Sequence, residues 1–230
     1  MKKNVLVTAL LSVAASGAMA QSAFNGAYGQ VGIGYESVTP SISPGNLKVT
    51  GSGPLVGSYP ISASMSNANS LSGAVGLGYN YTVTKDFLLG IGAEYNPITS
   101  QSANFSGSIS KLGNGSGTWK KDNSYNIFIS PATPIGQDGL LYGKVGYTGA
   151  TIKGSGNGTS STNNLTGYSL GAGYKQIITG GIYGFGEVNY ASYGNSTISK
   201  STSVSTYTVS QSSTLSANSF NVMLGVGYKF

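Results

Sequence analysis

The sequence contains no cysteine and no histidine, and only 8% of its residues are charged. Without cysteine the chain forms no disulfide and offers no thiol for an N-terminal lipid anchor. Without histidine it lacks the commonest acid–base group of enzymes, and the two absences together remove the usual zinc ligands. We therefore expect no enzyme activity, no metal site and no cofactor.

All twelve basic residues are lysines, and they are scattered along the chain. Nucleic-acid-binding proteins instead gather their basic residues into a stripe or patch. We therefore expect no nucleic-acid partner.

Long apolar runs are also missing, because no window approaches the roughly 18 apolar residues of a membrane helix. The chain is nevertheless rich in glycine (36 residues) and tyrosine (16), and a soluble domain carries about 25% charged residues. Disorder does not explain this composition, since aliphatic and aromatic residues recur in alternating blocks. A chain too poor in charge for water and too polar for helical spans indicates a transmembrane β-barrel.

The first twenty residues have the features of a cleaved signal peptide. Lys2 and Lys3 precede an apolar stretch, and Ala18 and Ala20 are the small residues that a signal peptidase recognises before Gln21. We therefore divide the chain into a signal peptide (1–20) and one barrel domain (21–230). Removal of the two leading lysines leaves ten lysines against six acids, a net charge of +4.

Eight segments alternate between apolar and small or polar residues with a period of two, which is the pattern of tilted spanning strands. They are residues 27–36, 71–83, 87–96, 123–135, 140–148, 167–177, 182–190 and 217–230. In segment 182–190 either face could meet lipid, and we place Glu187 inside because a carboxylate in hydrocarbon costs up to a few kcal/mol. The predicted fold is an all-β, up-and-down antiparallel barrel of eight strands.

The connections between these segments alternate in length. Those after the second, fourth and sixth segments are short, whereas the others are long and polar: 37–70, 97–122, 149–164 and 191–216. Short periplasmic turns, long external loops and two periplasmic termini are typical of outer-membrane barrels. Residues Val204 to Val209 also alternate, so some loops could extend as hairpins beyond the membrane, and ten strands remain an alternative.

Aromatic residues fall at both ends of the predicted strands, as two girdles at the membrane interfaces do. The outer set is Tyr35, Tyr95, Tyr125, Tyr147, Tyr168, Tyr190 and Phe220, and the inner set is Tyr79, Tyr81, Phe87, Tyr174, Tyr228 and Phe230. Eight steps separate Phe87 from Tyr95, a rise of about 20 Å for a strand tilted by about 40°. This height is close to that of the apolar band of an outer-membrane barrel.

The chain ends in a glycine, two residues, an aromatic, one residue and a final aromatic: Gly225, Tyr228 and Phe230. This ending resembles the β-signal of outer-membrane proteins, although Leu224 stands where a polar residue is usual. Repeats of the form Gly-x-Gly-Tyr, as at 32–35 and 76–79, also resemble the porin-like outer-membrane barrels of the OmpA and OmpX type. The resemblance implies the outer membrane of a Gram-negative bacterium and the barrel-assembly machinery as a partner. The barrel enzymes of this membrane resemble catalysts that depend on a histidine, and this chain has no histidine.

Six ionisable residues are assigned to the lumen: Glu36, Glu94, Lys144, Lys175, Glu187 and Lys229. An eight-stranded barrel is just wide enough for its own side chains to fill it. We therefore favour a hydrogen-bonded plug of paired charges, with a charge-lined conduit for ions or small solutes as the alternative. Inward-facing glycines would make room for the long side chains beside them.

The external loops carry lysines, of which Lys120 and Lys121 stand beside Trp119, the only tryptophan. These three residues are candidates for contact with the phosphates of lipopolysaccharide at the outer interface. Ordinary solubility of a polar loop explains the lysines equally well.

Three functions remain open. The favoured one is a structural envelope barrel with a plugged lumen, and we expect a monomer. A small passive pore is the second, and a surface adhesin acting through the long external loops is the third. One barrel architecture hosts many roles, so the fold alone does not choose between them.

Overall fold

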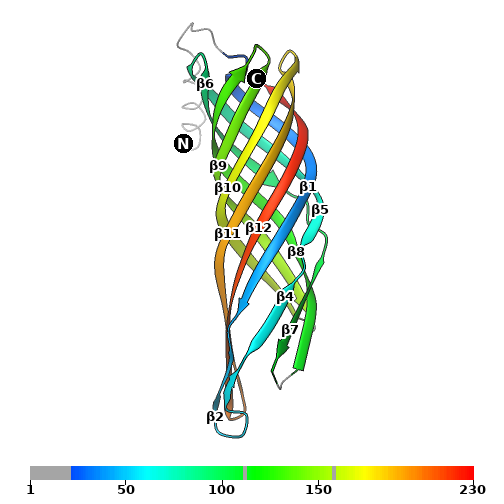
Figure 1. Cartoon of the computed structure of the whole chain (residues 1–230), viewed down its shortest axis with the longest axis vertical. Helices are drawn as coiled ribbons and strands as arrows, with labels where there is room; N and C mark the ends of the chain where they lie inside the picture. The colour runs from blue at the N-terminus through cyan, green and yellow to red at the C-terminus, as the bar shows by residue number, and fades with distance from the viewer. Residues whose placement is uncertain (1–21, 111–112, 157–158) are drawn as a thin grey trace, which may run out of the picture.

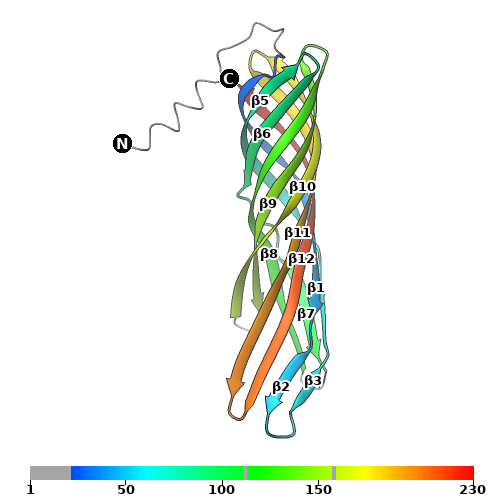
Figure 2. The same cartoon turned by 90° about the vertical axis from the view of Figure 1, so that its left-hand side faces the viewer.

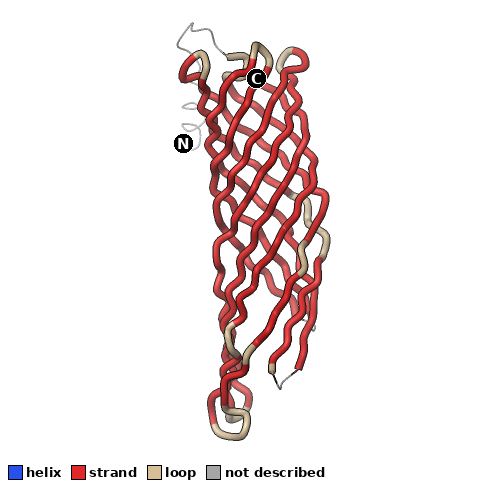
Figure 3. The backbone as a smooth tube through the Cα atoms, viewed as in Figure 1, coloured by secondary structure: helices blue, strands red, loops and turns tan. Residues whose placement is uncertain are grey.

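The computed structural model describes residues 22–110, 113–156 and 159–230. The predicted signal peptide and its cleavage site (Ala18, Ala20 and Gln21) lie outside the described residues. Nearly all of the described chain is β-strand, as the red tube of Figure 3 shows. In this part of the chain no helix has the length and apolarity needed to cross a membrane.

Eight antiparallel strands form a closed ring, which confirms the predicted fold (Figure 1). In ring order they are β1 (Gly26–Pro44), β5 (Ala68–Thr84), β6 (Phe87–Asn96), β8 (Gly113–Ile135), β9 (Gly139–Gly156), β10 (Thr159–Thr179), β11 (Ile182–Val204) and β12 (Tyr207–Lys229). Strands β1 and β12 close the ring, with registers from Tyr28 opposite Lys229 to Pro44 opposite Ser213.

The alternative of ten strands is wrong. Val204 pairs with Tyr207, so the alternating stretch at 204–209 is the tip of the β11–β12 hairpin and not an additional spanning strand. Ser205 takes the left-handed backbone conformation (φ 53°) that such a tight turn requires.

The two ends of the barrel differ. At one end, here called the turn end, lie the short β5–β6, β8–β9 and β10–β11 connections together with the C-terminus (Figure 1). At the opposite, hairpin end the strands continue into long hairpins, and Figure 2 shows how far they project beyond the ring. Most ring strands therefore have 17 to 23 residues, against the roughly ten that spanning requires.

Much of what the sequence predicts as long polar loop is instead β-sheet. Four short strands extend the ring at the hairpin end: β2 (Leu47–Gly51), β3 (Gly57–Tyr59), β4 (Ile61–Met65) and β7 (Ala103–Ile109). Strand β2 pairs with β12 and β3 with β2, while β7 pairs with β8 and β4 with β7. Strands that continue past the membrane leave unpaired edges, and these short, serine- or threonine-containing segments pair with them. The prediction that some loops extend as hairpins is confirmed.

The predicted faces of the strands are confirmed. Ile33, Leu77 and Leu224 are exposed on the outside, and the aromatic residues of both predicted girdles lie on the same outward face. On β11 the ambiguous parity is resolved as expected, since Tyr183 and Glu187 are buried in the lumen. The molecule is therefore apolar outside and filled inside, the reverse of a soluble barrel.

Inward glycines make room for large lumen side chains, as the sequence predicts. A Cβ atom added at Gly78 would lie 2.5 Å from the Tyr28 hydroxyl, and one at Gly173 would lie 2.5 Å from Tyr142. At Gly227 it would collide with Tyr183. Each of these tyrosines thus lies across a glycine of a neighbouring strand, and the lumen is packed as closely as a protein core.

We predict that Gly173→Ala destabilises the barrel by about 1–3 kcal/mol, because the added methyl group overpacks the lumen against Tyr142. Gly143→Ala on the paired strand is the control, since its nearest atoms lie 3.8 and 4.0 Å from an added Cβ. Urea unfolding of the refolded barrel, followed by tryptophan fluorescence, measures both variants. Equal stability of the two would contradict the packing described here.

Candidate functional site in the barrel lumen

The centre of the lumen holds one lysine between two carboxylates. Lys144 of β9 donates to both oxygens of Glu94 on β6 at 2.9 Å and to Glu187 Oε1 on β11 at 2.6 Å. Lys144 is 3% exposed and Glu187 is 4% exposed. Buried charges need such partners, because removal from water costs several kcal/mol per ion.

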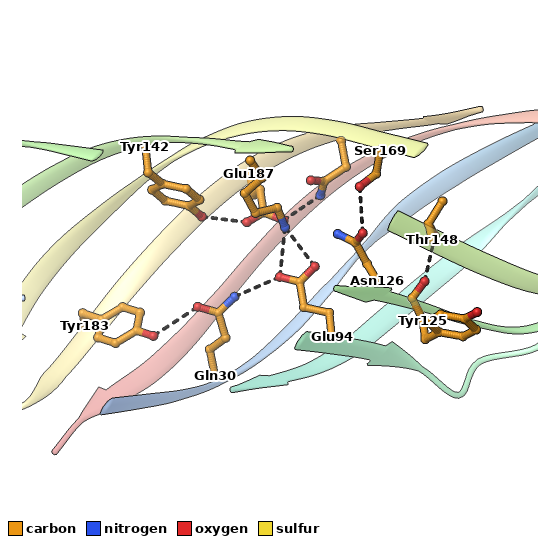
Figure 4. Close-up of polar contacts among 11 residues, drawn as sticks. Gln30, Glu94, Tyr125, Asn126, Tyr142, Thr148, Ser169, Tyr183 and Glu187 are labelled. Atoms are coloured by element: carbon orange, nitrogen blue, oxygen red, sulfur yellow. Dashed lines mark hydrogen bonds and ion pairs between the residues drawn. The ribbon is translucent and has the colours of Figure 1, made fainter. Parts of the chain in front are cut away.

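Further hydrogen bonds hold the two carboxylates in place (Figure 4). Tyr142 donates its hydroxyl to Glu187 Oε2 at 2.7 Å, and Asn189 donates to Glu187 Oε1 at 2.6 Å. On the other side Tyr183 donates to Gln30 at 3.1 Å, and Gln30 in turn reaches Glu94 at 3.4 Å. The network joins four strands of the ring, β1, β6, β9 and β11, so it links the barrel wall across the lumen.

Lys175 lies nearer the turn end among tyrosine rings. Its ammonium is 3.7 Å from the ring centre of Tyr28, 5.0 Å from that of Tyr183 and 5.2 Å from that of Tyr142. The negative faces of aromatic rings attract a cation, more strongly when water is excluded. Among the described residues no carboxylate lies within 4.0 Å of Lys175, so the rings are its main partners.

A second ion pair lies toward the hairpin end and corrects one prediction. Lys121, expected in an external loop at the lipopolysaccharide interface, is 1% exposed and donates to Glu36 at 2.5 Å inside the lumen. Ser219 also donates to Glu36, at 2.6 Å. The physical reason is a β-bulge between Lys121 and Ser124, which inverts the alternation that Tyr125 and Ile127 establish further along β8.

The same bulge turns Trp119 inward, so its predicted contact with lipopolysaccharide is also wrong. Trp119 is 2% exposed, and its indole N–H donates to the Ser66 carbonyl oxygen at 3.1 Å. Of the three residues predicted for that contact, only Lys120 points outward, and it lies opposite Lys153 on β9.

Five of the six ionisable residues predicted for the lumen therefore lie there, and Lys121 takes the place of the sixth, Lys229. Lys229 is half-buried at the turn end and has no ion pair among the described residues, whereas Lys121 joins the set. The described lumen then contains three glutamates and three lysines: Glu36, Glu94, Glu187, Lys121, Lys144 and Lys175. This balance of charge removes the net field that would attract an ion of either sign.

A cavity of about 80 Å³ separates the two ion-paired groups. Its lining includes Glu36, Glu94, Ser72 and Asn221. Asn221 donates to Ser72 at 3.0 Å, but its buried Oδ1 has no partner among the described residues. At about 30 Å³ per water molecule, a cavity of this size has room for about two or three waters, one of which could donate to that oxygen.

Apolar layers lie on both sides of the polar belt. The layer toward the turn end contains Phe24, Tyr28, Leu88, Leu140, Tyr142, Tyr183 and Phe185, among others. The layer toward the hairpin end contains Val38, Ala68, Trp119, Ile152, Leu165, Tyr193 and Leu215, among others. The ion pairs thus occupy the middle of the lumen, and Lys175 lies among the tyrosine rings of the turn-end layer.

The residues of the predicted assembly signal end strand β12. The rings of Tyr228 and Phe230 are exposed on the outside at the turn end, with their centres 5.1 Å apart in an edge-to-face arrangement. Gly225 faces inward, where an added Cβ would lie 2.5 Å from Phe185. In the described part of the chain no group of three or more Asp, Glu, His or Cys side chains could hold a metal ion.

We predict that Lys144→Met destabilises the barrel by about 3–5 kcal/mol, because it leaves two buried carboxylates without their cation. Lys85→Met is the control, since Lys85 and its partner Asp86 are 81% and 78% exposed and such pairs contribute little. Urea unfolding measures the difference. Recovery of most of the loss on adding Glu94→Gln and Glu187→Gln would attribute it to the unpaired charges.

A second prediction tests the bulge. Lys121→Gln is expected to destabilise the barrel by about 2–4 kcal/mol, because it leaves Glu36 buried without its ion pair. Lys120→Gln, one residue away on the outward face, is expected to change the stability by less than about 0.5 kcal/mol. The opposite ranking in urea unfolding would mean that strict alternation continues through residue 121.

Comparison with known proteins agrees with this architecture. A family model described as "Outer membrane protein beta-barrel domain" matches residues 6–230. No curated protein matches the chain.

Among solved structures, OprG from Pseudomonas aeruginosa is 15% identical, with 91% of this chain and 98% of that chain covered and a TM-score of 0.54. Ail, the attachment invasion locus protein of Yersinia pestis, is 19% identical over 90% of this chain and 99% of its own, with a TM-score of 0.41. The outer membrane protease OmpT from Escherichia coli is 9% identical over 94% and 100%, with a TM-score of 0.46. At 15% identity, the similarity to OprG shows only that the two chains have the same fold.

Proposed function

We propose that this chain, which belongs to the outer membrane protein beta-barrel domain family, acts as a closed structural barrel of the envelope. Its lumen is a core that holds the wall together and does not conduct. The long hairpins would present the surface through which the protein meets its surroundings.

The observation that supports this proposal is that buried side chains fill the lumen in successive layers along the barrel axis. Leu88 and Leu140 at the turn end are 0% and 1% exposed, Lys144 at the centre is 3% exposed, and Leu165 toward the hairpin end is 2% exposed. An aqueous channel through an outer-membrane barrel usually requires more than eight strands. The paired charges therefore act as a folded core, not as a filter.

The turn end would face the periplasm and the hairpin end the exterior, as in other bacterial barrels with short periplasmic turns. The absence of histidine from the sequence argues against the acid–base chemistry of barrel hydrolases, so the role is not enzymatic. Stability of the wall is then what the lumen residues contribute.

Single-channel conductance of the refolded, signal-free chain in a planar bilayer tests the proposal. We expect no stable open current, because no continuous water path crosses the two apolar layers. A heat-modifiable gel shift verifies folding, and an open porin in the same bilayer verifies the assay.

A stable current that changes with Lys144→Gln would overturn the proposal and favour a small pore. Lys85→Gln at the exposed β5–β6 turn is the matched control for loss of one charge. A current that neither substitution changes would still contradict a closed lumen.

A further inference from the structure

The outward surface of β8 and β9 carries two lysines opposite each other, beyond the aromatic girdle on the hairpin side. Lys120 pairs in register with Lys153, and both point away from the lumen because Trp119, Lys121 and Ile152 beside them are buried inside. Like charges directly opposite each other on one face of a sheet are destabilising. An anion bound between the two ammonium groups would relieve this repulsion.

One acid on the same face compensates only part of this charge. Asp122 forms an ion pair with Lys153 at 2.7 Å and accepts a hydrogen bond from Thr99 at 3.0 Å. One aspartate, paired with Lys153, thus stands beside two lysines, and the surface keeps one positive charge in excess. Lys153 remains 45% exposed in its ion pair, so its ammonium is open to a second anion.

The height of this surface matches that of lipid headgroups. Tyr125 and Tyr147 mark the girdle on the same strands, and Lys120 lies five residues beyond Tyr125, across the bulge. At ~3.3 Å per residue and a tilt of ~40°, with one residue lost to the bulge, the rise is about 10 Å. A lysine stem can also bend back along apolar surface toward the interface.

Polar groups that suit a sugar lie next to the lysines. Thr151 precedes Lys153 by two residues on the same face, and its hydroxyl donates to the Asn164 side chain at 3.0 Å. Both side chains are at the surface and keep further donor and acceptor capacity. Ammonium groups beside hydroxyl and amide groups suit a phosphorylated sugar.

The distribution of charge along the barrel points the same way. In the described chain the hairpin end carries Lys48, Lys120, Lys153 and Lys200 outside the lumen, against Asp122 alone. The turn end is balanced, with Lys85 and Lys229 against Asp86 and Asp138. An end with excess cations is attracted to an anionic leaflet.

We propose that Lys120 and Lys153 bind a phosphate of the lipid A part of lipopolysaccharide in the outer leaflet, with Thr151 and Asn164 contacting its sugar. The proposal rests on the hairpin end being external, as the proposed function has it, and is independent of whether the lumen conducts. Asp122 competes with the phosphate for Lys153, so it sets the affinity.

Binding of the refolded barrel to lipopolysaccharide in phosphatidylcholine vesicles tests this proposal. The variant Lys120→Gln with Lys153→Gln is compared with a matched control, Lys48→Gln with Lys200→Gln, which removes the same charge from the same end. We expect about fivefold weaker binding for each site lysine, and thus about 25-fold for the pair, against little change for the control. Asp122→Asn is expected to bind several-fold more tightly than the unmodified protein.

Equal losses for the two lysine pairs would overturn the proposal, because they would mean diffuse attraction to the whole hairpin end. Unchanged binding of lipopolysaccharide after enzymatic removal of its lipid A phosphates would overturn it as well. Phosphatidylglycerol vesicles distinguish the source of the phosphate, and equal affinity for them would exclude lipid A specificity. Folding of each variant is verified by its gel shift, and conductance reports separately on the closed lumen.

Discussion

Backbone polar groups in hydrocarbon must find their hydrogen-bond partners within the protein, and the rest of this structure depends on that constraint. The pairing of β1 with β12 satisfies it by leaving no open edge within the membrane-spanning part of the ring. Closure by eight strands sets the width of the barrel, which leaves an interior that side chains must fill. Successive side chains of a strand point to opposite faces, so every second residue of each strand points into that interior.

The interior is filled in an unusual order for a protein core, with its ion pairs in the middle. Lys144 has two carboxylates within 3 Å, Lys121 has Glu36, and Lys175 has three tyrosine rings. Each buried charge therefore has a partner, and the apolar layers at both ends keep water from competing with these contacts. Glycines opposite the tyrosines provide the volume that such large side chains need.

The sequence predicts the membrane part of the fold well because its alternation follows directly from a pleated strand with lipid on one side. Eight strands, their faces and both aromatic girdles were predictable from local pattern, and so was the inward position of Glu187, which the cost of a charge in lipid dictates. Beyond the membrane both faces of the hairpins meet water, and the pattern weakens. The sequence pattern therefore predicts loop from Leu47 to Met65 and in the outer halves of β8 and β12, where the structure has strand.

The sequence by itself determined which residues face the lumen wherever alternation is unbroken, and hence the grouping of Glu94, Lys144 and Glu187. Only the tertiary structure decided that Lys121 and Trp119 turn inward while Lys120 stays outside. A single extra residue in β8 reverses every side chain that precedes it, and local sequence carries no clear signal for that bulge. The position of the bulge is instead set by contacts across the barrel. It lets Lys121 pair with the buried Glu36, and it lets the indole ring of Trp119 pack into the apolar layer.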